Sequence, residues 1–449
     1  MIRRALRVAD ERSGSVPFVR KALRYAFPDH WSFLLGEVAL YAFIVLVATG
    51  VYLTFFFEPS TDRIVYHGSY GPLDGLEMSK AYASALRISF DVKAGLLIRQ
   101  THHWAANVFI VAIVLHLIRI FFTGAYRKPR ELTYVIGVLM LFTALLEGYL
   151  GYSLVDDLLS GMGLAIGYAV ALSIPFVGAN LALLIWGAPL PGDPDFWSRM
   201  YIAHVLILPI LIGTLLAAHL ALVASRHHTQ FKHKPRQSER RLLGIPSFPG
   251  QAPRSLGLLF AVASVLVLLG GLVQINPIWL WGPYEVSQGT NGAQPDWYLG
   301  WLIGALRLVP HFDVVVFDRT LVPNPFWGGV LFPMVVMGAL LLWPWLERRV
   351  TGDYRTHNLL DRPRDAPWRT AIGAGFLTWV VMIFMFGSAD RVTVFLGISY
   401  VAQLWAFRIG VWVVPIVVLL VTRRVCLELQ EEEQIEREQA RAVRSAPSS

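Results

Sequence analysis

Cysteine is nearly absent from this sequence of 449 residues, in which Cys426 is the single example. One thiol cannot form an internal disulfide. It also cannot supply the Cys-x-x-Cys-His attachment of a c-type haem or the thiolate ligands of an iron–sulfur cluster. Any redox group that the chain holds must therefore be bound non-covalently, mostly through histidine or methionine.

Charged residues are also few, at 16% of the chain, whereas 55% of the residues are hydrophobic. This apolar fraction is too high for an ordinary soluble protein, and it occurs in long runs that favour a lipid bilayer as partner. The net charge of +8 then indicates basic loops at a membrane surface, so we expect no nucleic acid partner. Residues 1–31 are basic and lack an apolar core with a cleavage site, so we expect no cleavable signal.

Eight apolar stretches are long enough to cross a bilayer as helices of about 20 residues. They lie near 33–57, 95–121, 133–155, 200–224, 255–275, 327–347, 371–388 and 404–422. The interval 158–186 is also apolar, but glycine and proline interrupt it, so we expect short surface helices there. The predicted fold class is an all-α integral membrane protein with eight transmembrane helices, the first four forming a bundle.

Basic residues predict the orientation. With the N-terminus inside, the segments on the inner side contain 29 of the 39 Lys and Arg residues, which favours eight spans and two cytoplasmic termini. The predicted parts are a basic cytoplasmic segment 1–31, a four-helix bundle 32–225, a basic cytoplasmic loop 226–254, a four-span region 255–426 with an outer loop 276–326, and a partly disordered cytoplasmic tail 427–449. The loop 58–94 also faces outward.

Four histidines lie inside two of the predicted spans. His102 and His116 are fourteen residues apart in span two, which corresponds to about 21 Å of helix rise and nearly four turns, so they share a face. His204 and His219 in span four are fifteen apart, with Pro209 between them to adjust the phase. Both spans run inward, so the pairs predict two bis-histidine b-type haems.

In this arrangement His102 and His204 bind the outer iron, and His116 and His219 bind the inner iron. A lone intramembrane histidine can instead be satisfied by a carbonyl group. Four in matched pairs favour ligation, because unneeded ionisable residues are costly in hydrocarbon. His103 is an alternative to His102, but it lies about 100° further round the helix.

Glycines and arginines fit the same arrangement. Two further pairs at fourteen-residue spacing lie in spans one and three: Gly36 with Gly50, and Gly137 with Gly151. Such glycines let a flat macrocycle approach the backbone, although ordinary helix packing also favours them. Three arginines near the span ends are candidates for pairing with haem propionates, or for snorkelling to headgroups: Arg99, Arg119 and Arg199.

The outer loop contains Pro295-Asp296-Trp297-Tyr298. A carboxylate beside two aromatic rings at the membrane surface can accept a proton while the rings pack against a lipid-soluble ligand. Aromatic belts with acidic neighbours are a simpler interpretation of the loop alone.

Together these motifs, with residues 173–178, resemble cytochrome b of the quinol–cytochrome c reductase (cytochrome bc) complex over residues 25–425. The wording of 155–161 and 357–363 is most similar to the actinobacterial branch. The resemblance implies a catalytic subunit with two non-covalent b-type haems, an outer one of low potential and an inner one of high potential. Quinol, by this likeness menaquinol, is oxidised at the outer face, with Asp296 as proton acceptor beside Tyr298, and Pro295, Trp297 and Tyr152 lining the site.

By the same resemblance, one electron passes to a Rieske-type iron–sulfur subunit and on to a c-type cytochrome subunit. The other crosses the two haems to a quinone at the inner face, which contributes to a proton gradient. The complex is expected to be homodimeric and to lie in the bacterial cytoplasmic membrane.

The sequence departs from the family pattern at both quinone sites. Val155-Asp156-Asp157 replaces a common Pro-Trp-Gly in the outer site's wall. At the inner site Ala224 replaces a usual histidine, and an acid is missing around Arg254-Ser255. Three basic-loop residues are open candidates to substitute: Arg226, His227 and His228.

Two other functions fit some of these features. Membrane haem anchors of hydrogenases or formate dehydrogenases also use bis-histidine haems, but they are usually shorter and lack the Pro-Asp-Trp-Tyr loop. A transporter with functional intramembrane histidines would need inverted repeats and broken spans, neither of which is clear here.

Overall fold

The structure is a computed structural model that describes residues 23, 25–232, 237–240, 242–289 and 295–445. Most of the predicted N-terminal segment therefore lies outside the described residues. The same is true of parts of the basic loop (233–236 and 241), of the outer loop (290–294) and of the end of the tail (446–449).

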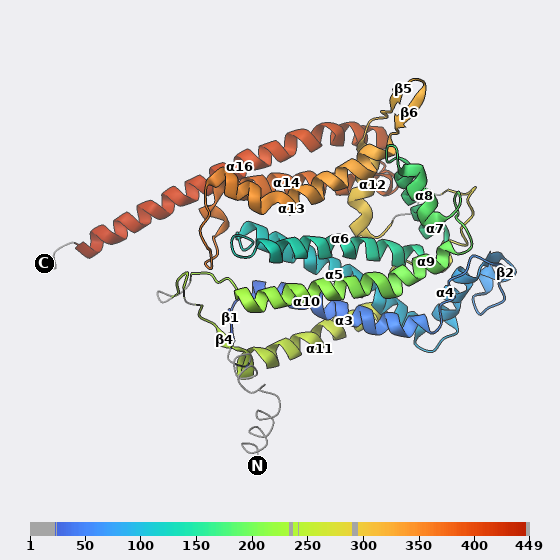
Figure 1. Cartoon of the computed structure of the whole chain (residues 1–449), viewed down its shortest axis with the longest axis horizontal. Coiled ribbons are helices and arrows are strands. Elements are labelled where there is room, and N and C mark those ends of the chain that lie inside the picture. The colour runs from blue at the N-terminus through green and yellow to red at the C-terminus, as the bar shows by residue number, and fades with distance from the viewer. Residues whose placement is uncertain (1–22, 24, 233–236, 241, 290–294, 446–449) are drawn as a thin grey trace, which may run out of the picture.

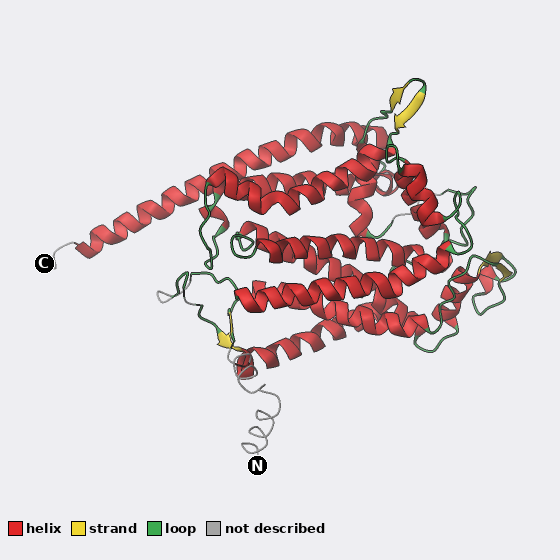
Figure 2. Cartoon of the chain, in the orientation of Figure 1, coloured by secondary structure: helices red, strands yellow, loops and turns green. Residues whose placement is uncertain are grey.

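Long helices lying side by side make up most of the protein (Figures 1 and 2). They are α3 (Leu34–Thr54), α5 (Gly95–Phe122), α6 (Glu131–Ser153), α9 (Phe196–Ile202) continuing through η3 (Ala203–Ile207) into α10 (Leu208–Arg226), α11 (Ala252–Leu272), α13 (Phe332–Thr351), α14 (Pro367–Phe386) and α16 (Tyr400–Ser445). Within the described residues, eight helical segments are long and apolar enough to cross a membrane. The predicted all-α, eight-span fold class is confirmed.

The glycine- and proline-rich interval 158–186 forms two short helices, as expected. They are α7 (Leu158–Leu172) and α8 (Gly178–Trp186). The side chain of Asp157 caps α7 by accepting a hydrogen bond from the Ser160 amide at 2.8 Å. Neither helix is long enough to span a bilayer.

Short elements lie at the two ends of the long helices (Figure 1). One end carries β2 (Arg63–Val65), β3 (Glu77–Ser79), α4 (Lys80–Phe90), α12 (Gly300–Leu308), β5 (Val314–Val316) and β6 (Arg319–Val322), and the other carries β1 (Ala26–Phe27) and β4 (Ile245–Pro246). Between the last two spans lies α15 (Ala389–Leu396). The small strands were not predicted, since each is only two to four residues long.

Contacts between loops join segments that the prediction puts on the same side of the membrane. On the inner side β1 pairs with β4, which joins the N-terminal segment to the loop after span four. The buried guanidinium of Arg130 donates to the carbonyl oxygens of Arg226, His227 and His357, which joins three inner loops. On the outer side the Leu158 amide donates to the Gly282 carbonyl at 3.0 Å. A ninth span at 158–186 would place such partners on opposite sides of the membrane.

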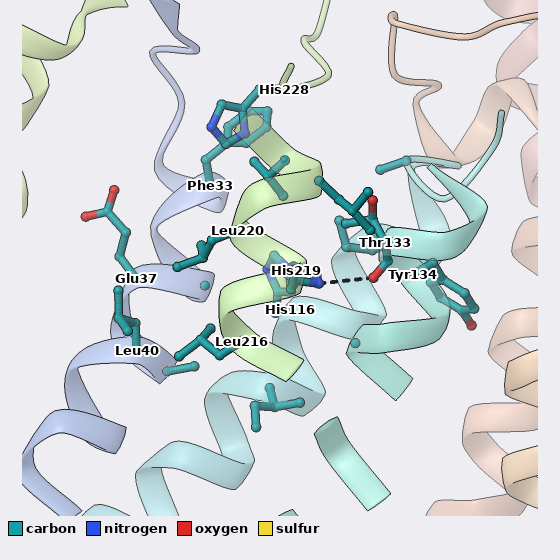
Figure 3. A pocket seen from close by; sticks show the side chains of 18 of the residues that line it. Phe33, Glu37, Leu40, His116, Thr133, Tyr134, Leu216, His219, Leu220 and His228 are labelled. Atoms are coloured by element: carbon teal, nitrogen blue, oxygen red, sulfur yellow. Dashed lines mark hydrogen bonds between the residues drawn. The ribbon is translucent and has the colours of Figure 1, made fainter. Parts of the chain in front are cut away.

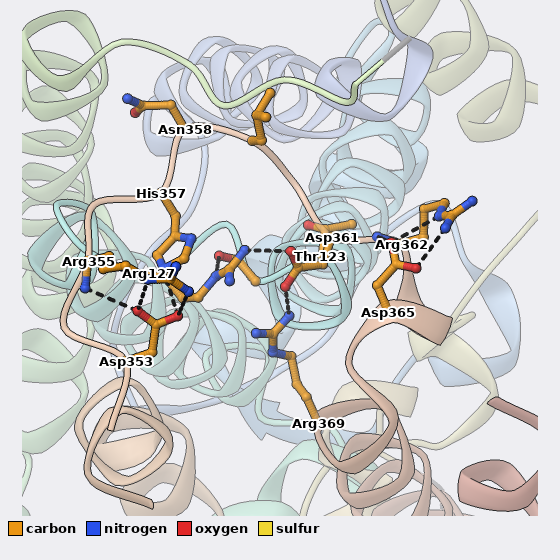
Figure 4. Close-up of polar contacts among 12 residues, drawn as sticks. Thr123, Arg127, Asp353, Arg355, His357, Asn358, Asp361, Arg362, Asp365 and Arg369 are labelled. Atoms are coloured by element: carbon orange, nitrogen blue, oxygen red, sulfur yellow. Dashed lines mark hydrogen bonds and ion pairs between the residues drawn. The ribbon is translucent and has the colours of Figure 1, made fainter. Parts of the chain in front are cut away.

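The inner end of the C-terminal region is held by buried ion pairs (Figure 4). Arg369 of α14, whose side chain is 6% exposed, lies 2.6 Å from Glu347 of α13 and 2.8 Å from Asp361. Asp361 also pairs with Arg127, in the loop after α5, at 3.0 Å. Because each buried charge has an opposite partner, removing one member is expected to destabilise this junction.

A wide helical turn explains the irregular histidine spacing in span four. Residues Ala203–Ile207 form a π-helical turn, η3, directly before the segment that contains Pro209. Proline lacks an amide hydrogen and crowds the carbonyl four residues earlier, which a wider turn relieves. A π turn accommodates one extra residue. The fifteen-residue separation of His204 and His219 therefore matches the regular fourteen of span two, and the expected phase adjustment is made beside Pro209.

Candidate functional site

Two cavities lie among the first four spans, one above the other. The outer cavity, of about 270 Å³, is lined by His102 and His204, whose ring centroids are 6.3 Å apart. The inner cavity, of about 420 Å³, is lined by His116 and His219, both labelled in Figure 3. Phe109 and Ile212 line both cavities and therefore form the partition. The structure thus brings together the two predicted pairs.

Each of the four predicted glycines faces one of the four histidines. The pairs are Gly36 with His116, Gly50 with His102, Gly137 with His219, and Gly151 with His204. A Cβ atom on Gly36 or Gly50 would lie 3.3 Å from Cε1 of its histidine, and one on Gly151 would collide with the ring. Helix α3 therefore leaves room for the histidines of α5, and α6 does so for those of η3 and α10.

In three of these histidines Nδ1 lies close to an oxygen atom of the protein. Nδ1 of His102 is 2.9 Å from the Thr49 hydroxyl, Nδ1 of His204 is 2.9 Å from a Glu147 carboxylate oxygen, and Nδ1 of His219 is 3.0 Å from the Thr133 carbonyl (Figure 3). A carbonyl or carboxylate can only accept, so it selects the tautomer protonated at Nδ1. That tautomer leaves the lone pair of Nε2 for a metal.

Two of the three predicted arginines lie where they can meet an anionic group at these cavities. Arg99 lines the outer cavity, and its buried Nε and Nη2 atoms have no hydrogen-bond partner in the described part of the chain. Arg119 lines the inner cavity, and its Nη2 atom is in the same situation among the described residues. Arg199 is placed differently, because it is half-exposed and paired with Asp193 at 2.8 Å. Its role at a propionate stays a prediction.

These residues fit two b-type haems. In the part of the chain that the structure describes, no three or more His, Cys, Asp or Glu side chains cluster to hold a bare metal ion. Haem iron already has four porphyrin nitrogens, so two axial imidazoles complete its coordination. Paired imidazoles, facing glycines and buried guanidinium groups fit that requirement in both cavities.

The predicted quinol-site loop contributes a hydrogen-bonded cluster to the outer cavity. The Tyr298 hydroxyl donates to Oδ2 of Asp296 at 2.9 Å, and Nε2 of His103 lies 2.7 and 2.8 Å from the two carboxylate oxygens. Sequence reasoning had considered His103 only as an alternative iron ligand. Its ring instead faces Asp296, which supports His102 for that role.

The other residues predicted for the quinol site differ in position. Tyr152 lines the outer cavity beside Asp296 and Tyr298, and its buried hydroxyl has no hydrogen-bond partner among the residues described. Pro295 and Trp297 do not line that cavity. Trp297 is 38% exposed and packs against Phe384 of α14.

Sequence reasoning missed Glu147. Its carboxylate lies in the apolar span three and faces the outer cavity. An ionisable residue inside a predicted span is itself a signal of a functional site. That signal could have identified Glu147 before the structure was known.

Two buried aspartates stand where the family pattern has Pro-Trp-Gly. Burial raises the pKa of Asp156 from 3.8 to about 7, and that of Asp157 to about 6. Asp157 is fully buried, and Arg99 attracts its charged form. The segment at this position is therefore buried and polar beside Arg99, although neither aspartate lines the outer cavity itself.

All three open candidates for the inner quinone site, Arg226, His227 and His228, line the inner cavity. Burial lowers the pKa of His228 to about 4, so its ring is neutral at pH 7. Glu37, at the start of α3 and labelled in Figure 3, is also among the residues that line the cavity. It accepts a hydrogen bond from Gln251 at 3.0 Å. An acidic side chain is thus present at the inner cavity, although it comes from span one and not from the segment before span five.

Comparisons with known proteins identify the family and the fold. Residues 107–283 match the family model described as cytochrome b (N-terminal)/b6/petB. A solved structure named "Hyperthermophilic respiratory Complex III" aligns over 93% of this chain and 99% of its own, with a TM-score of 0.65. Its sequence is 20% identical, so this likeness shows a shared fold.

Closer relatives are each named "Cytochrome bc1 complex cytochrome b subunit". The protein of Streptomyces coelicolor is 44% identical over 95% of this chain and 77% of its own length. That of Corynebacterium diphtheriae is 45% identical over 94% and 78%, and that of Mycobacterium tuberculosis is 47% identical over 92% and 75%. With such identity over nearly its full length, the chain belongs to the family of quinol-oxidising cytochrome b subunits of the cytochrome bc1 complex.

Proposed function

We propose that this chain is the catalytic subunit of a quinol–cytochrome c reductase and that it holds two b-type haems between two quinone sites. The observation that carries the proposal is the matched pairing in the two cavities, each with one histidine from span two, one from span four and a facing glycine for each. Neither a haem anchor nor a transporter is supported by the family match.

At the outer cavity, Asp296 would accept a proton from the quinol. A carboxylate can do so when an oxygen comes within hydrogen-bonding distance of the quinol hydroxyl. Tyr298 and His103 hold the carboxylate from two sides, which fixes its orientation. The apolar wall around it, with Tyr152, would pack the quinol ring.

The four histidines would hold the two haem irons, and Arg99 and Arg119 would pair with haem propionates. Held in this way, the haems would supply one-electron transfer between the two faces of the membrane. At the inner cavity, Glu37 and the neutral His228 ring lie where a quinone would be reduced.

The partners proposed for the chain follow from its family. They are a Rieske-type iron–sulfur subunit that takes the first electron, a c-type cytochrome subunit, and a second copy of the complex in a homodimer. The basic inner loops favour cytoplasmic termini in a bacterial membrane. Menaquinone is the proposed substrate, because the relatives reported above are actinobacterial.

Turnover of the assembled complex with menaquinol and ubiquinol analogues tests this proposal. We expect cytochrome c reduction to be faster with the menaquinol analogue. Equal or faster turnover with ubiquinol would contradict the choice of menaquinone, and no turnover with either quinol would contradict the catalytic role.

A further inference from the structure

The oxygen atoms that face the four ligand histidines differ in kind. Thr49 presents a neutral hydroxyl to His102. That hydroxyl donates its own hydrogen to the Val45 carbonyl at 2.6 Å, so it accepts from Nδ1 of the histidine. The inner histidine His219 faces a neutral carbonyl, and Nδ1 of His116 has no partner in the described part of the chain. Of the four, His204 is the one that faces a carboxylate.

That carboxylate belongs to Glu147 of α6. Oε1 lies 2.9 Å from Nδ1 of His204, and both side chains are largely buried, at 18% and 17% exposure. The N–H direction is off the line to the oxygen. The two buried groups are therefore in close contact, although the hydrogen bond between them is not aligned. The second oxygen, Oε2, is buried and has no hydrogen-bond partner among the described residues.

A carboxylate behind a metal-bound imidazole makes that imidazole a stronger electron donor than a carbonyl or hydroxyl does. A stronger donor stabilises ferric iron relative to ferrous iron and lowers the reduction potential. Hydrogen bonding behind the axial ligand is one of the main ways in which a protein sets that potential.

The charges lining the two cavities also favour a lower reduction potential for the outer haem. The outer cavity is lined by two carboxylates, Glu147 and Asp296, and one guanidinium. The inner cavity is lined by one carboxylate and three guanidinium groups: Glu37, Arg119, Arg130 and Arg226. Since reduction adds an electron, a more negative surrounding disfavours it at the outer position.

We propose that Glu147 is the positioning residue that holds His204 and lowers the potential of the outer haem below that of the inner haem. The inference rests on the proposed function, because it assumes the two haems. It adds the residue that makes the reduction potentials of the two haems unequal. Neither the spacing of the histidines nor that of the glycines indicates this difference in potential.

The test is a spectroelectrochemical titration of both b haems in the assembled complex carrying Glu147→Gln. This change keeps the side-chain size and removes the charge. At a fixed ambient potential, we expect the reduced-to-oxidised ratio of the outer haem to rise about tenfold, equivalent to about 59 mV for one electron. The ratio for the inner haem should stay within about twofold.

Two control variants distinguish the effect of the Glu147–His204 contact from the effect of removing any carboxylate or any acceptor. Glu77→Gln removes an exposed carboxylate of β3 that lines neither cavity, so it should leave the outer haem's ratio unchanged. Thr49→Val removes the neutral acceptor of His102 and should shift the ratio less than Glu147→Gln does.

An unshifted outer haem in Glu147→Gln, with both haems present, would overturn the inference and leave the proposed function intact. Absence of b-haem signals in the unmodified complex would overturn the proposed function instead. If the complex with Glu147→Gln does not retain the outer haem, the same titration is carried out on Glu147→Asp. This variant keeps the charge but retracts it by one methylene group, and we expect a rise of at least about twofold. No rise in that variant would also overturn the inference.

Discussion

The outer and inner cavities have the same ligand pattern but different surroundings. In both, a histidine from α5 and one from span four lie opposite glycines of α3 and α6. Around the outer pair are Glu147 and the cluster of Asp296, Tyr298 and His103. Around the inner pair are arginines and a neutral histidine from the loops.

This difference separates two tasks. The repeated histidines and glycines come from helix periodicity and suit the holding of two similar flat groups. The unlike groups come from side chains and loops outside that repeat. They put carboxylates at the outer cavity and a mostly positive lining at the inner cavity, which suits the proton acceptance and quinone reduction proposed above.

The largest effect is expected from removing a single ligand. His204→Ala or His102→Ala should abolish the outer haem while the inner haem is at least partly retained, because the inner ligands lie in a separate cavity. A reduced-minus-oxidised spectrum of the purified complex measures both. Loss of neither signal would contradict the pairing.

Asp296→Asn should slow quinol oxidation by roughly 100-fold with both haems intact, because a positioned general base typically contributes two or more orders of magnitude. Steady-state turnover with saturating quinol measures the change. Asp318→Asn is a matched control, since Asp318 is an exposed residue between β5 and β6 on the same side. Unchanged turnover in Asp296→Asn would show that another group accepts the proton.

A smaller, cavity-selective effect is expected at the glycines. Gly151→Val should reduce the outer haem content, because the added Cβ collides with the ring of His204. Gly36→Val should reduce the inner haem content, because its Cβ would lie 3.3 Å from His116. Gly213→Val in α10 is the control, since a Cβ there meets nothing within 4 Å. Equal loss of both haems in either variant would contradict the prediction that each glycine affects the haem of its own cavity.

The smallest effect expected is on stability, and it concerns Asp156, which follows α6. The folded protein raises the pKa of Asp156 from 3.8 to about 7, so folding favours its protonated form. The group's contribution to stability is therefore greatest below about pH 4 and is lost as the pH rises to about 7. Asp156→Asn should raise the melting temperature relative to the unmodified protein more at pH 8 than at pH 4. A difference that does not depend on pH would contradict the buried, protonated state.

The features predictable from the sequence are those set by helix periodicity. The positions of His102, His116, Gly36 and Gly50 follow from a regular repeat along α3 and α5, and the structure brings each glycine against a histidine. Contacts between distant segments were not predictable. His103 meets Asp296 across 193 positions of sequence, which depends on how the outer loop folds over span two.

Irregular backbone was the other limit. The π-helical turn that contains His204 has no reliable sequence signature beyond the nearby Pro209. The fifteen-residue spacing in span four therefore did not match the fourteen-residue spacing in span two. The ion pair of Arg199 with Asp193 was not predicted either, because it depends on the local loop. Both outcomes depend on short-range geometry that spacing alone does not specify.

Potentiometric titration of the b-type absorption in the purified, assembled complex tests the central claim most directly. Two haems per copy of this chain, titrating as two components with the outer one at the lower potential, are expected from the two unlike cavities. A single component with one haem per chain, or no b-type absorption, would contradict the assignment of His102, His116, His204 and His219 as the ligands of two haems.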